Sequence, residues 1–375
     1  MMDRLSDHIS ETSHKDVLIE DQLKELRGGG LPVVIFGGGS NAKAVERFLS
    51  RNSISTAAFC ESPYYFSQGK RINGKPVYKY GTLPKDLSPC NMVLAASGKS
   101  IREIIEEPSE NIRSLYVFDV TTPLFSMTAQ WVKQHVHELD ATYQMLQDEE
   151  SREVFLSFIE DKAGCVTKSV KPLWKLWTSD QYFNDLYDPK AYQEQGLIDC
   201  GAWIGDTAEQ YLDFLREQKV SGRVYAFEPD PDNYRKLENN AKRLEAVQCF
   251  PYAVGDERKR IFFTIGKGSQ SRCQKENSGI EVQMVTVDEL LSNKNISMIK
   301  MDLEGAEAAA LRGMRKIISE QMPMLAICVY HKVDDLITIP QCILKLQTGR
   351  DKRYKFYLRH HSCTAYETVL YAVPE

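Results

Sequence analysis

Two acids and two glycines in the second half of the chain stand at spacings that could bind a ligand. Asp199 closes a short apolar run, and Gly201 and Gly205 flank the turn that follows it. Glu228 ends the next apolar run, residues 223–227. A glycine turn lets a ligand approach the backbone closely, and the N–H groups that open the following helix face that ligand. The later acid can accept hydrogen bonds from both hydroxyls of a ribose, so the pattern predicts a nucleoside site.

The charge of this turn indicates which nucleoside it would bind. A dinucleotide site has three glycines, G-x-G-x-x-G, because a pyrophosphate lies against the end of the helix. Here the run reads D-C-G-A-W-I-G-D-T, and Asp206 falls in the first helical turn. Negative charge repels a phosphate and suits an amine or a sulfonium, so we expect S-adenosylmethionine rather than NAD. The residues expected to bind this cofactor are Asp199, Gly201, Ala202, Gly205, Thr207, Glu228, Ala253 and Asp302.

Composition limits the classes of protein that fit this chain. A length of 375 residues suggests two or three domains with ample core, and a net charge of −5 argues weakly against a nucleic-acid partner. The nine cysteines include no C-x-x-C pair, which favours a reducing compartment over a disulfide scaffold or zinc site. The first twenty residues are polar and acidic, and no apolar run approaches the ~20 residues of a membrane helix. We therefore expect a cytoplasmic protein with no membrane span.

The first part of the chain predicts a separate, smaller Rossmann-like α/β domain at residues 31–120, after a lead-in at residues 1–30. Gly37, Gly39 and Ala42 match G-x-G-x-x-A after an apolar run, and Glu61 stands at the spacing of a ribose-binding acid. Alternating strands and helices imply a parallel sheet with right-handed crossovers. Either this domain binds a nucleotide, such as NAD(P) or a nucleotide-sugar, or it is a packing or assembly module. The expected strands are 32–36, 56–60, 92–96 and 115–119.

Residues 121–195 change to helical spacing and predict a helical connector. Tyr182 lies in its aromatic second half, where it either lines a cofactor or acceptor pocket or is plain core. The second domain follows at residues 196–375. Its expected strands are 197–200, 223–227, 247–254, 296–301 and 324–330, with an inserted strand pair at 260–265 and 280–287 and a terminal antiparallel hairpin at 354–359 and 368–373.

Three motifs in order resemble one known family. The stretches D-C-G-A-W-I-G-D-T, Y-A-F-E-P-D-P and I-K-M-D-L-E-G-A-E-A-A-A-L-R-G resemble the FkbM family of S-adenosylmethionine-dependent methyltransferases, and the Y-H-K-V-D-D-L and F-Y-L-R-H-H segments are similar to bacterial members. The resemblance covers about residues 197–375. It implies a class I methyltransferase sheet and transfer of a methyl group to a hydroxyl of a sugar, glycan or related natural product. The domain at 31–120 lies outside this resemblance.

Transfer to a hydroxyl needs a residue that accepts its proton. Asp302 and His331 end the fourth and fifth expected strands, and the ordinary pKa of histidine suits a general base. We expect His331 to act as the base, with Asp302 orienting it or the acceptor. Acceptor contacts are expected from Tyr182, Glu304 and His360, with a small-molecule or glycan acceptor as partner. Glu304 and Glu307 could join Asp302 around a divalent metal, but we expect none to be required. Two alternatives remain: an NAD(P)- or nucleotide-sugar-binding enzyme that acts through the first domain, and an assembly module that binds S-adenosylmethionine without catalysing.

Overall fold

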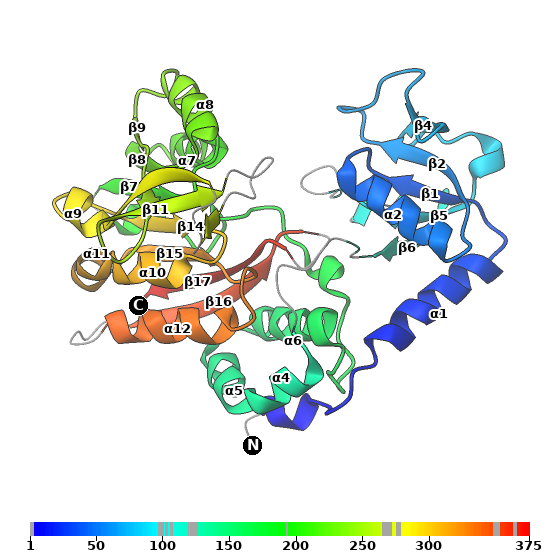
Figure 1. Cartoon of the computed structure of the whole chain (residues 1–375), viewed down its shortest axis with the longest axis horizontal. Helices are drawn as coiled ribbons and strands as arrows, with labels where there is room; N and C mark the ends of the chain where they lie inside the picture. The colour runs from blue at the N-terminus through cyan, green and yellow to red at the C-terminus, as the bar shows by residue number, and fades with distance from the viewer. Residues whose placement is uncertain are drawn as a thin grey trace. The chain divides into compact units, whose positions relative to one another are not determined.

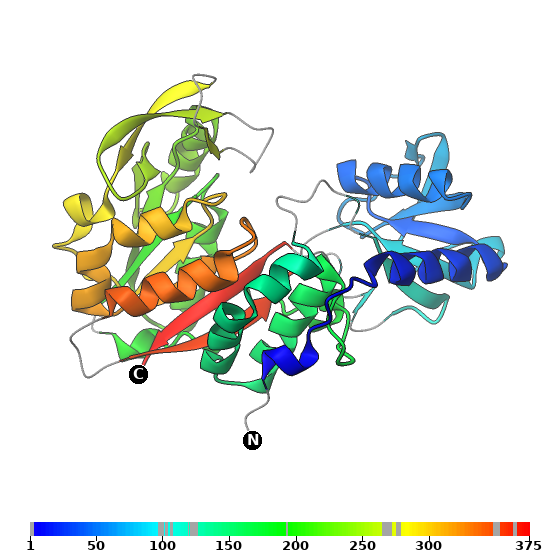
Figure 2. The same cartoon turned by 60° about the horizontal axis from the view of Figure 1, so that its bottom comes forward.

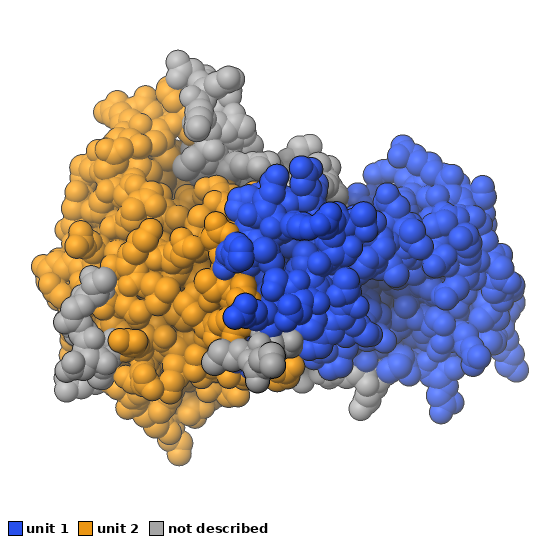
Figure 3. Space-filling model, turned by 90° about the horizontal axis from the view of Figure 1, so that it is seen from below, with its two compact units in different colours: residues 1–137, 152–179, 360–368 blue, residues 138–151, 180–359, 369–375 orange. Residues whose placement is uncertain are grey.

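The structure is a computed structural model of the whole chain. It describes residues 4–96, 101, 104–105, 108–118, 120, 127–192, 194–264, 272–274, 279–347, 353–362 and 366–375. These residues form two compact units (Figure 3). Unit 1 comprises residues 1–137, 152–179 and 360–368, and unit 2 comprises residues 138–151, 180–359 and 369–375.

Unit 1 is built on a six-stranded sheet with the order β3-β4-β2-β1-β5-β6 (Figure 1). Strand β1 pairs in parallel with β2 on one side and with β5 on the other, so the chain order reverses beside β1. Strand β4 also pairs in parallel with β2. Strands β3 and β4 were not expected from the sequence, and they form an antiparallel hairpin. The strands are β1 (Val33–Phe36), β2 (Thr56–Glu61), β3 (Arg71–Ile72), β4 (Lys75–Lys79), β5 (Cys90–Leu94) and β6 (Ile112–Val117).

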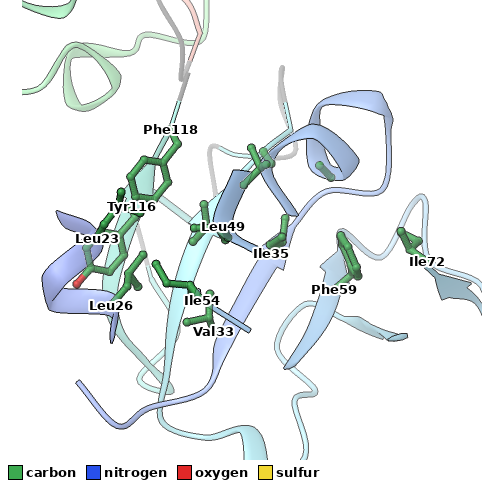
Figure 4. Packing of buried hydrophobic residues seen from close by; sticks show 14 of the residues in the cluster. Leu23, Leu26, Val33, Ile35, Leu49, Ile54, Phe59, Ile72, Tyr116 and Phe118 are labelled. Carbon is green, nitrogen blue, oxygen red and sulfur yellow. The ribbon is translucent and has the colours of Figure 1, made fainter. Parts of the chain in front are cut away.

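The core of this sheet is packed by two helices from the start of the chain. Helix α1 (Lys15–Gly28) buries Leu23 and Leu26, and α2 (Ser40–Arg51) buries Leu49. Figure 4 shows these side chains in one cluster with Tyr116, which lies in β6, and Phe118, which follows β6. Aliphatic residues at helical spacing form such a buried stripe because one face of each helix must cover the sheet.

The connector region contains the predicted helices. They are α4 (Ala129–Gln134), α5 (Val136–Met145) and α6 (Glu149–Ala163), followed by short 3₁₀ turns at Leu173–Leu176 and Pro189–Ala191. The division into compact units runs through this region, at residues 137/138, 151/152 and 179/180. None of the described helices combines the length and apolar character that crossing a membrane requires. The seven cysteines whose side chains the structure describes are free thiols.

Unit 2 is built on a seven-stranded sheet with the order β16-β17-β15-β14-β7-β8-β9. Strands β9, β8, β7, β14 and β15 run parallel, and β17 is antiparallel to β15. This order confirms the predicted class I methyltransferase sheet with its terminal hairpin. Its strands are β7 (Gln195–Cys200), β8 (Gly222–Phe227), β9 (Val247–Phe250), β14 (Met298–Met301), β15 (Met324–Cys328), β16 (Tyr354–His360) and β17 (Thr368–Pro374).

The helices of unit 2 connect the parallel strands. Helices α10, α11 and α12 pack against one another beside the sheet (Figure 2). Asp230 followed by Pro231 predicts the start of a helix, and α8 begins there. The Asp230 carboxylate accepts hydrogen bonds from the N–H groups of Asp232 and Asn233. The helices are α7 (Asp206–Glu217), α8 (Pro231–Ala241), α9 (Val287–Leu291), α10 (Glu307–Arg312), α11 (Arg315–Gln321) and α12 (Asp335–Leu346).

Two predicted elements of unit 2 are wrong in extent. The strand expected at 247–254 ends at Phe250, because Pro251 has no N–H to continue the ladder. Residues 253–254 instead form β10 of a four-stranded sheet, order β10-β13-β11-β12, with β11 (Lys259–Thr264), β12 (Arg272–Gln274) and β13 (Ile280–Val285). Apolar residues at helical spacing from Ala310 to Ile318 predict a single helix after β14, but the structure has two. They part at Gly313, where a Cβ would lie 1.9 Å from the Gly255 carbonyl oxygen.

Candidate functional site

The site begins with the turn that follows β7, at the place where the chain order of the second sheet reverses. Strand β7 pairs with β8 on one side and β14 on the other, and ligands of open α/β sheets bind at this kind of edge. Gly201 has φ 81° and Gly205, which caps α7, has φ 87°. A Cβ on Gly201 would lie 2.0 Å from the carbonyl oxygen of Asp302. Only glycine fits there, so the turn lies directly against the end of β14.

Glu228 holds this turn from the neighbouring strand. It is 6% exposed. Its Oε2 accepts a hydrogen bond from the Trp203 N–H at 2.9 Å, and its Oε1 accepts one from the Asp230 N–H at 2.9 Å. Burial raises the pKa of the Glu228 carboxyl to about 7, against the lowering effect of these two N–H groups. Each carboxylate oxygen keeps a lone pair for a further donor.

A buried ion pair that the sequence analysis missed lies beneath the turn. Lys300 in β14 is 3% exposed, and its Nζ lies 3.0 Å from Oδ1 of the fully buried Asp199. The same Nζ donates a hydrogen bond to the Gly201 carbonyl oxygen at 2.9 Å. Burial alone would lower the pKa of Lys300, but the carboxylates of Asp199 and Asp302 raise it. The signal was available, since a lysine within an apolar strand must meet an anion when buried.

Tyr182 covers the same lysine. Its ring centroid lies 5.5 Å from Lys300 Nζ, a cation–π distance, and its hydroxyl lies 3.6 Å from Cys328 Sγ. Tyr182 has φ 70° and is 6% exposed, and its N–H donates to the Tyr371 hydroxyl. Tyr182, from the predicted connector, therefore lies against the ion pair, and little of its side chain is exposed for contact with an acceptor.

Asp302, Glu304 and His331 come together at the carboxyl ends of β14 and β15, joined by a fourth residue, Glu307. His331 Nε2 lies 3.3 Å from Asp302 Oδ1 and 4.0 Å from Glu304 Oε2. His331 Nδ1 lies 2.8 Å from Glu307 Oε1. The His331 and Glu307 side chains are 2% and 1% exposed, whereas that of Asp302 is 28% exposed. Asp302 is therefore the most accessible member of this cluster, and a ligand can reach its carboxylate.

The electrostatics of this cluster favour a charged imidazole. Burial alone would lower the pKa of His331, but the Glu307 and Asp302 carboxylates raise it well above its usual value. Burial alone would raise the pKa of Asp302, but the hydrogen bond and charge of His331 lower it, helped by Lys300 and the Tyr330 hydroxyl. A carboxylate faces each ring nitrogen, so the surroundings favour the charged form of the imidazole, and that charge in turn favours the ionised form of Asp302.

Two carboxylates, those of Glu307 and Asp335, hold the loops of this cluster. Glu307 Oε1 accepts the N–H of Leu303 at 2.8 Å, and Asp335 Oδ2 accepts the N–H of His331 at 2.9 Å. Burial raises the pKa of Asp335 to about 7. Glu307, His331 and Asp335 place ligand atoms within 4.8 Å of one another, which is close enough to hold a cation. Here the imidazolium itself supplies the positive charge between the carboxylates.

The remaining predicted residues lie in different places. Ala202 is buried beside the turn and donates its N–H to the Phe227 carbonyl, and Thr207 lies in the first turn of α7. Ala253 is buried in β10 of the smaller sheet, where it pairs with Met284. His360 is the last residue of β16, at the point where the chain passes from unit 2 to unit 1; it is 0% exposed and places Nδ1 3.0 Å from the Thr368 hydroxyl. The roles predicted for these residues stay predictions.

The strand order and the turn at its reversal define a class I methyltransferase fold. Residues 199–345 match the model of the methyltransferase FkbM domain, so this chain contains a domain of the FkbM methyltransferase family. A crystal structure of methyltransferase FkbM from Methylobacillus flagellatus KT is similar, with a TM-score of 0.57 and 18% sequence identity. The similarity covers 95% of this chain and 96% of that one. It supports the same fold.

Two characterised relatives are similar in sequence. The hexuronic acid methyltransferase AglP of Haloferax volcanii is 26% identical over 161 residues, which is 40% of this chain and 64% of that protein. The 2-O-methyltransferase NoeI of Sinorhizobium fredii is 24% identical over 147 residues, which is 33% of this chain and 59% of that protein. The chain thus spans less than two thirds of the length of either relative.

Proposed function

We propose that this protein is an S-adenosylmethionine-dependent O-methyltransferase that acts on a hydroxyl of a sugar, a glycan or a related natural product. The observation that carries the proposal is Glu228. This buried carboxylate stands at the end of β8 and holds the glycine turn of β7 through the Trp203 N–H. An acid at this point of such a sheet is placed to receive both hydroxyls of a ribose.

The residues of the turn fit the proposed donor. Glu228 has lone pairs left for the ribose, and the bare backbone of Gly201 leaves room for a close approach. Asp206 opens α7, so the end of the helix carries negative charge that disfavours a phosphate. The donor supplies a methyl group that is already activated on a sulfonium. Gly201, Gly205 and Glu228 would hold it, and Asp302 would add negative charge near it. Asp199, expected from the sequence to bind the cofactor, is fully buried and would act indirectly, through the Lys300 that bonds the Gly201 carbonyl.

The protein's part in methyl transfer is then positioning and proton acceptance. Holding the two reactants ~3 Å apart in line can supply much of the rate acceleration. Asp302, ionised and the most exposed of its cluster, would orient the acceptor hydroxyl and accept its proton. His331 cannot accept a proton while it carries one, so we now assign it as a positioning residue that keeps Asp302 ionised. This replaces our expectation from the sequence that His331 is the base.

Support for the acceptor class comes from the relatives. One is named for hexuronic acid and the other for methylation at a 2-O position. A sugar hydroxyl is weakly acidic, which is the situation in which the carboxylate of Asp302 is useful. A cytoplasmic site of action, expected from the cysteine content, stays a prediction.

Methyl transfer from isotopically labelled S-adenosylmethionine tests this function. The acceptors would be methyl glycosides of hexuronic acids, with the matching neutral hexoses and a matching series of amines. The expected product is a sugar with a labelled methyl ether, and its formation should require Asp302. Label on an amine would refute O-methylation. Tight donor binding with no product from any acceptor would favour the non-catalytic alternative.

A further inference from the structure

Unit 1 contains a cavity of its own at the carboxyl ends of its parallel strands. The cavity is about 510 Å³ in volume and is lined by residues from β1, β2, α2 and the loops between them. It lies beside β1, where the chain order of this sheet reverses. That is the place at which open α/β sheets bind ligands, and the volume is within the range of small-molecule sites.

One wall of the cavity offers backbone donors. The loop Gly37-Gly38-Gly39 leads into α2, and the N-cap Gly39 supplies no side-chain hydrogen bond to the helix. Among the described residues, no group accepts a hydrogen bond from the N–H groups of Gly38, Gly39, Ser40 or Asn41. The Asn41 Oδ1 atom is buried and also has no partner there. Uncapped N–H groups with glycine backbone form a site for an anion such as a phosphate group.

A second wall carries an acid and a base. Glu61, at the end of β2, is 5% exposed, and both of its oxygens lie 2.8 Å from Lys70 Nζ. The Glu61 carboxylate lies so close to the loop that a Cβ on Gly38 would be 1.7 Å from its Oε1 atom. An acid here is placed for ribose hydroxyls, as Glu228 is in unit 2. Lys70 offsets its charge, so the cavity is not anionic.

An aromatic side chain completes the lining. Tyr65 borders the cavity and is 64% exposed. A large aromatic ring that is left in solvent beside a cavity suits the flat face of a nucleobase, because every base presents such a face for stacking. The cavity thus presents groups for three chemically different parts of one ligand.

We propose that unit 1 binds the nucleoside diphosphate group of a nucleotide. The diphosphate lies against the uncapped N–H groups of the glycine loop, the ribose meets Glu61, and the base stacks on Tyr65. This group is common to nicotinamide dinucleotides and to nucleotide-sugars. The site is separate from the one in unit 2, so the inference does not depend on the proposed methyl transfer.

Introducing a negative charge at position 39 tests the site. Space is open around Gly39, whose φ of −80° suits any residue. Gly39→Asp places a carboxylate at the end of α2, and Gly39→Asn is the control of equal size that can also cap the helix. Isothermal titration calorimetry of the full chain would use ADP, UDP and NAD, each up to 5 mM. S-adenosylhomocysteine would be titrated in parallel to report on unit 2.

The expected result is a dissociation constant below 1 mM for at least one nucleotide. Gly39→Asp should weaken that binding at least tenfold more than Gly39→Asn, and Tyr65→Ala should weaken it about tenfold. A preference for NAD would indicate a dinucleotide, and a preference for UDP a nucleotide-sugar. The inference is overturned if no nucleotide binds the parent protein and cooperative melting shows that this protein is folded. Cooperative melting of the variants is the matching control for their folding. It is also overturned if both substitutions at Gly39 have equal effects.

Discussion

The buried ion pair between Lys300 and Asp199 gives the sharpest prediction about stability. Replacing Lys300 with Met keeps the length of the side chain but removes its charge. Asp199, which is fully buried, then keeps a carboxylate with no compensating cation. The Gly201 carbonyl oxygen also loses its hydrogen bond from Nζ. Breaking one partner of a buried pair costs about 3–5 kcal/mol.

The same argument predicts that the two residues are coupled. For a unit of this size, each kcal/mol lowers the melting temperature by about 2–4 °C, so Lys300→Met should lower it by about 6–20 °C. Asp199→Asn alone should also destabilise, because it leaves the ammonium group buried and unpaired. The double variant Lys300→Met/Asp199→Asn removes both charges, and it should recover at least ~1.5 kcal/mol relative to the sum of the two single losses.

Chemical denaturation of the four proteins gives this coupling free energy directly. Lys294→Met is the control, since Lys294 is exposed and its replacement should change stability by less than about 0.5 kcal/mol. Additive losses in the double variant would refute the reasoning. So would a Lys300→Met protein as stable as the control.

Further predictions concern the site. Because burial raises the pKa of Glu228 to about 7 and the ribose must bind its ionised form, affinity for S-adenosylhomocysteine should fall as pH drops from 8 to 6. Glu228→Gln should bind weakly with no such slope, and a slope retained in Glu228→Gln would exclude this carboxyl as its source. Asp302→Asn should lower kcat by about 10²–10⁴ while affinity for S-adenosylhomocysteine, which lacks the sulfonium charge, stays within about threefold, whereas unchanged turnover would remove Asp302 as proton acceptor. His331→Gln should lower kcat and destabilise the protein. The raised pKa of His331 means that its stabilising contribution is full below about pH 6.5 and is lost as pH rises through its folded-state value, so the stability deficit of the variant should shrink at high pH. Gly201→Ala should weaken donor binding and stability together, measured by calorimetry and melting, because the new Cβ would meet the Asp302 carbonyl and φ is 81°; normal values for both would contradict the close approach.

Much of the sheet architecture could be predicted from sequence because apolar runs in parallel strands are continuous and end in polar residues. The runs ending near Asp199, Glu228 and Asp302 became β7, β8 and β14 in the expected order. Turn chemistry also transferred well, since Gly201 and Gly205 both take positive φ. The predictions that were wrong concern the ends of elements that a single residue determines. Pro251 ends β9, and the tight contact at Gly313 separates α10 from α11.

The protonation state of the site could not be predicted, because it depends on distances between strands that are far apart in sequence. A histidine after a strand suggests a base of ordinary pKa. Its two carboxylate neighbours, Asp302 and Glu307, become visible only when β14 and β15 are paired. Lys300 was missed for a similar reason, since its partner Asp199 comes from another strand.

The central claim is that unit 2 binds S-adenosylmethionine through Glu228 and the glycine turn. The most direct measurement is thermal or chemical unfolding of the full chain with S-adenosylhomocysteine, with NAD and NADP added separately. At 100 times its dissociation constant the ligand should add about 2.7 kcal/mol of stability. We predict this gain with S-adenosylhomocysteine and its loss in Glu228→Ala. Stabilisation by the nicotinamide nucleotides, with none from S-adenosylhomocysteine, would contradict the account.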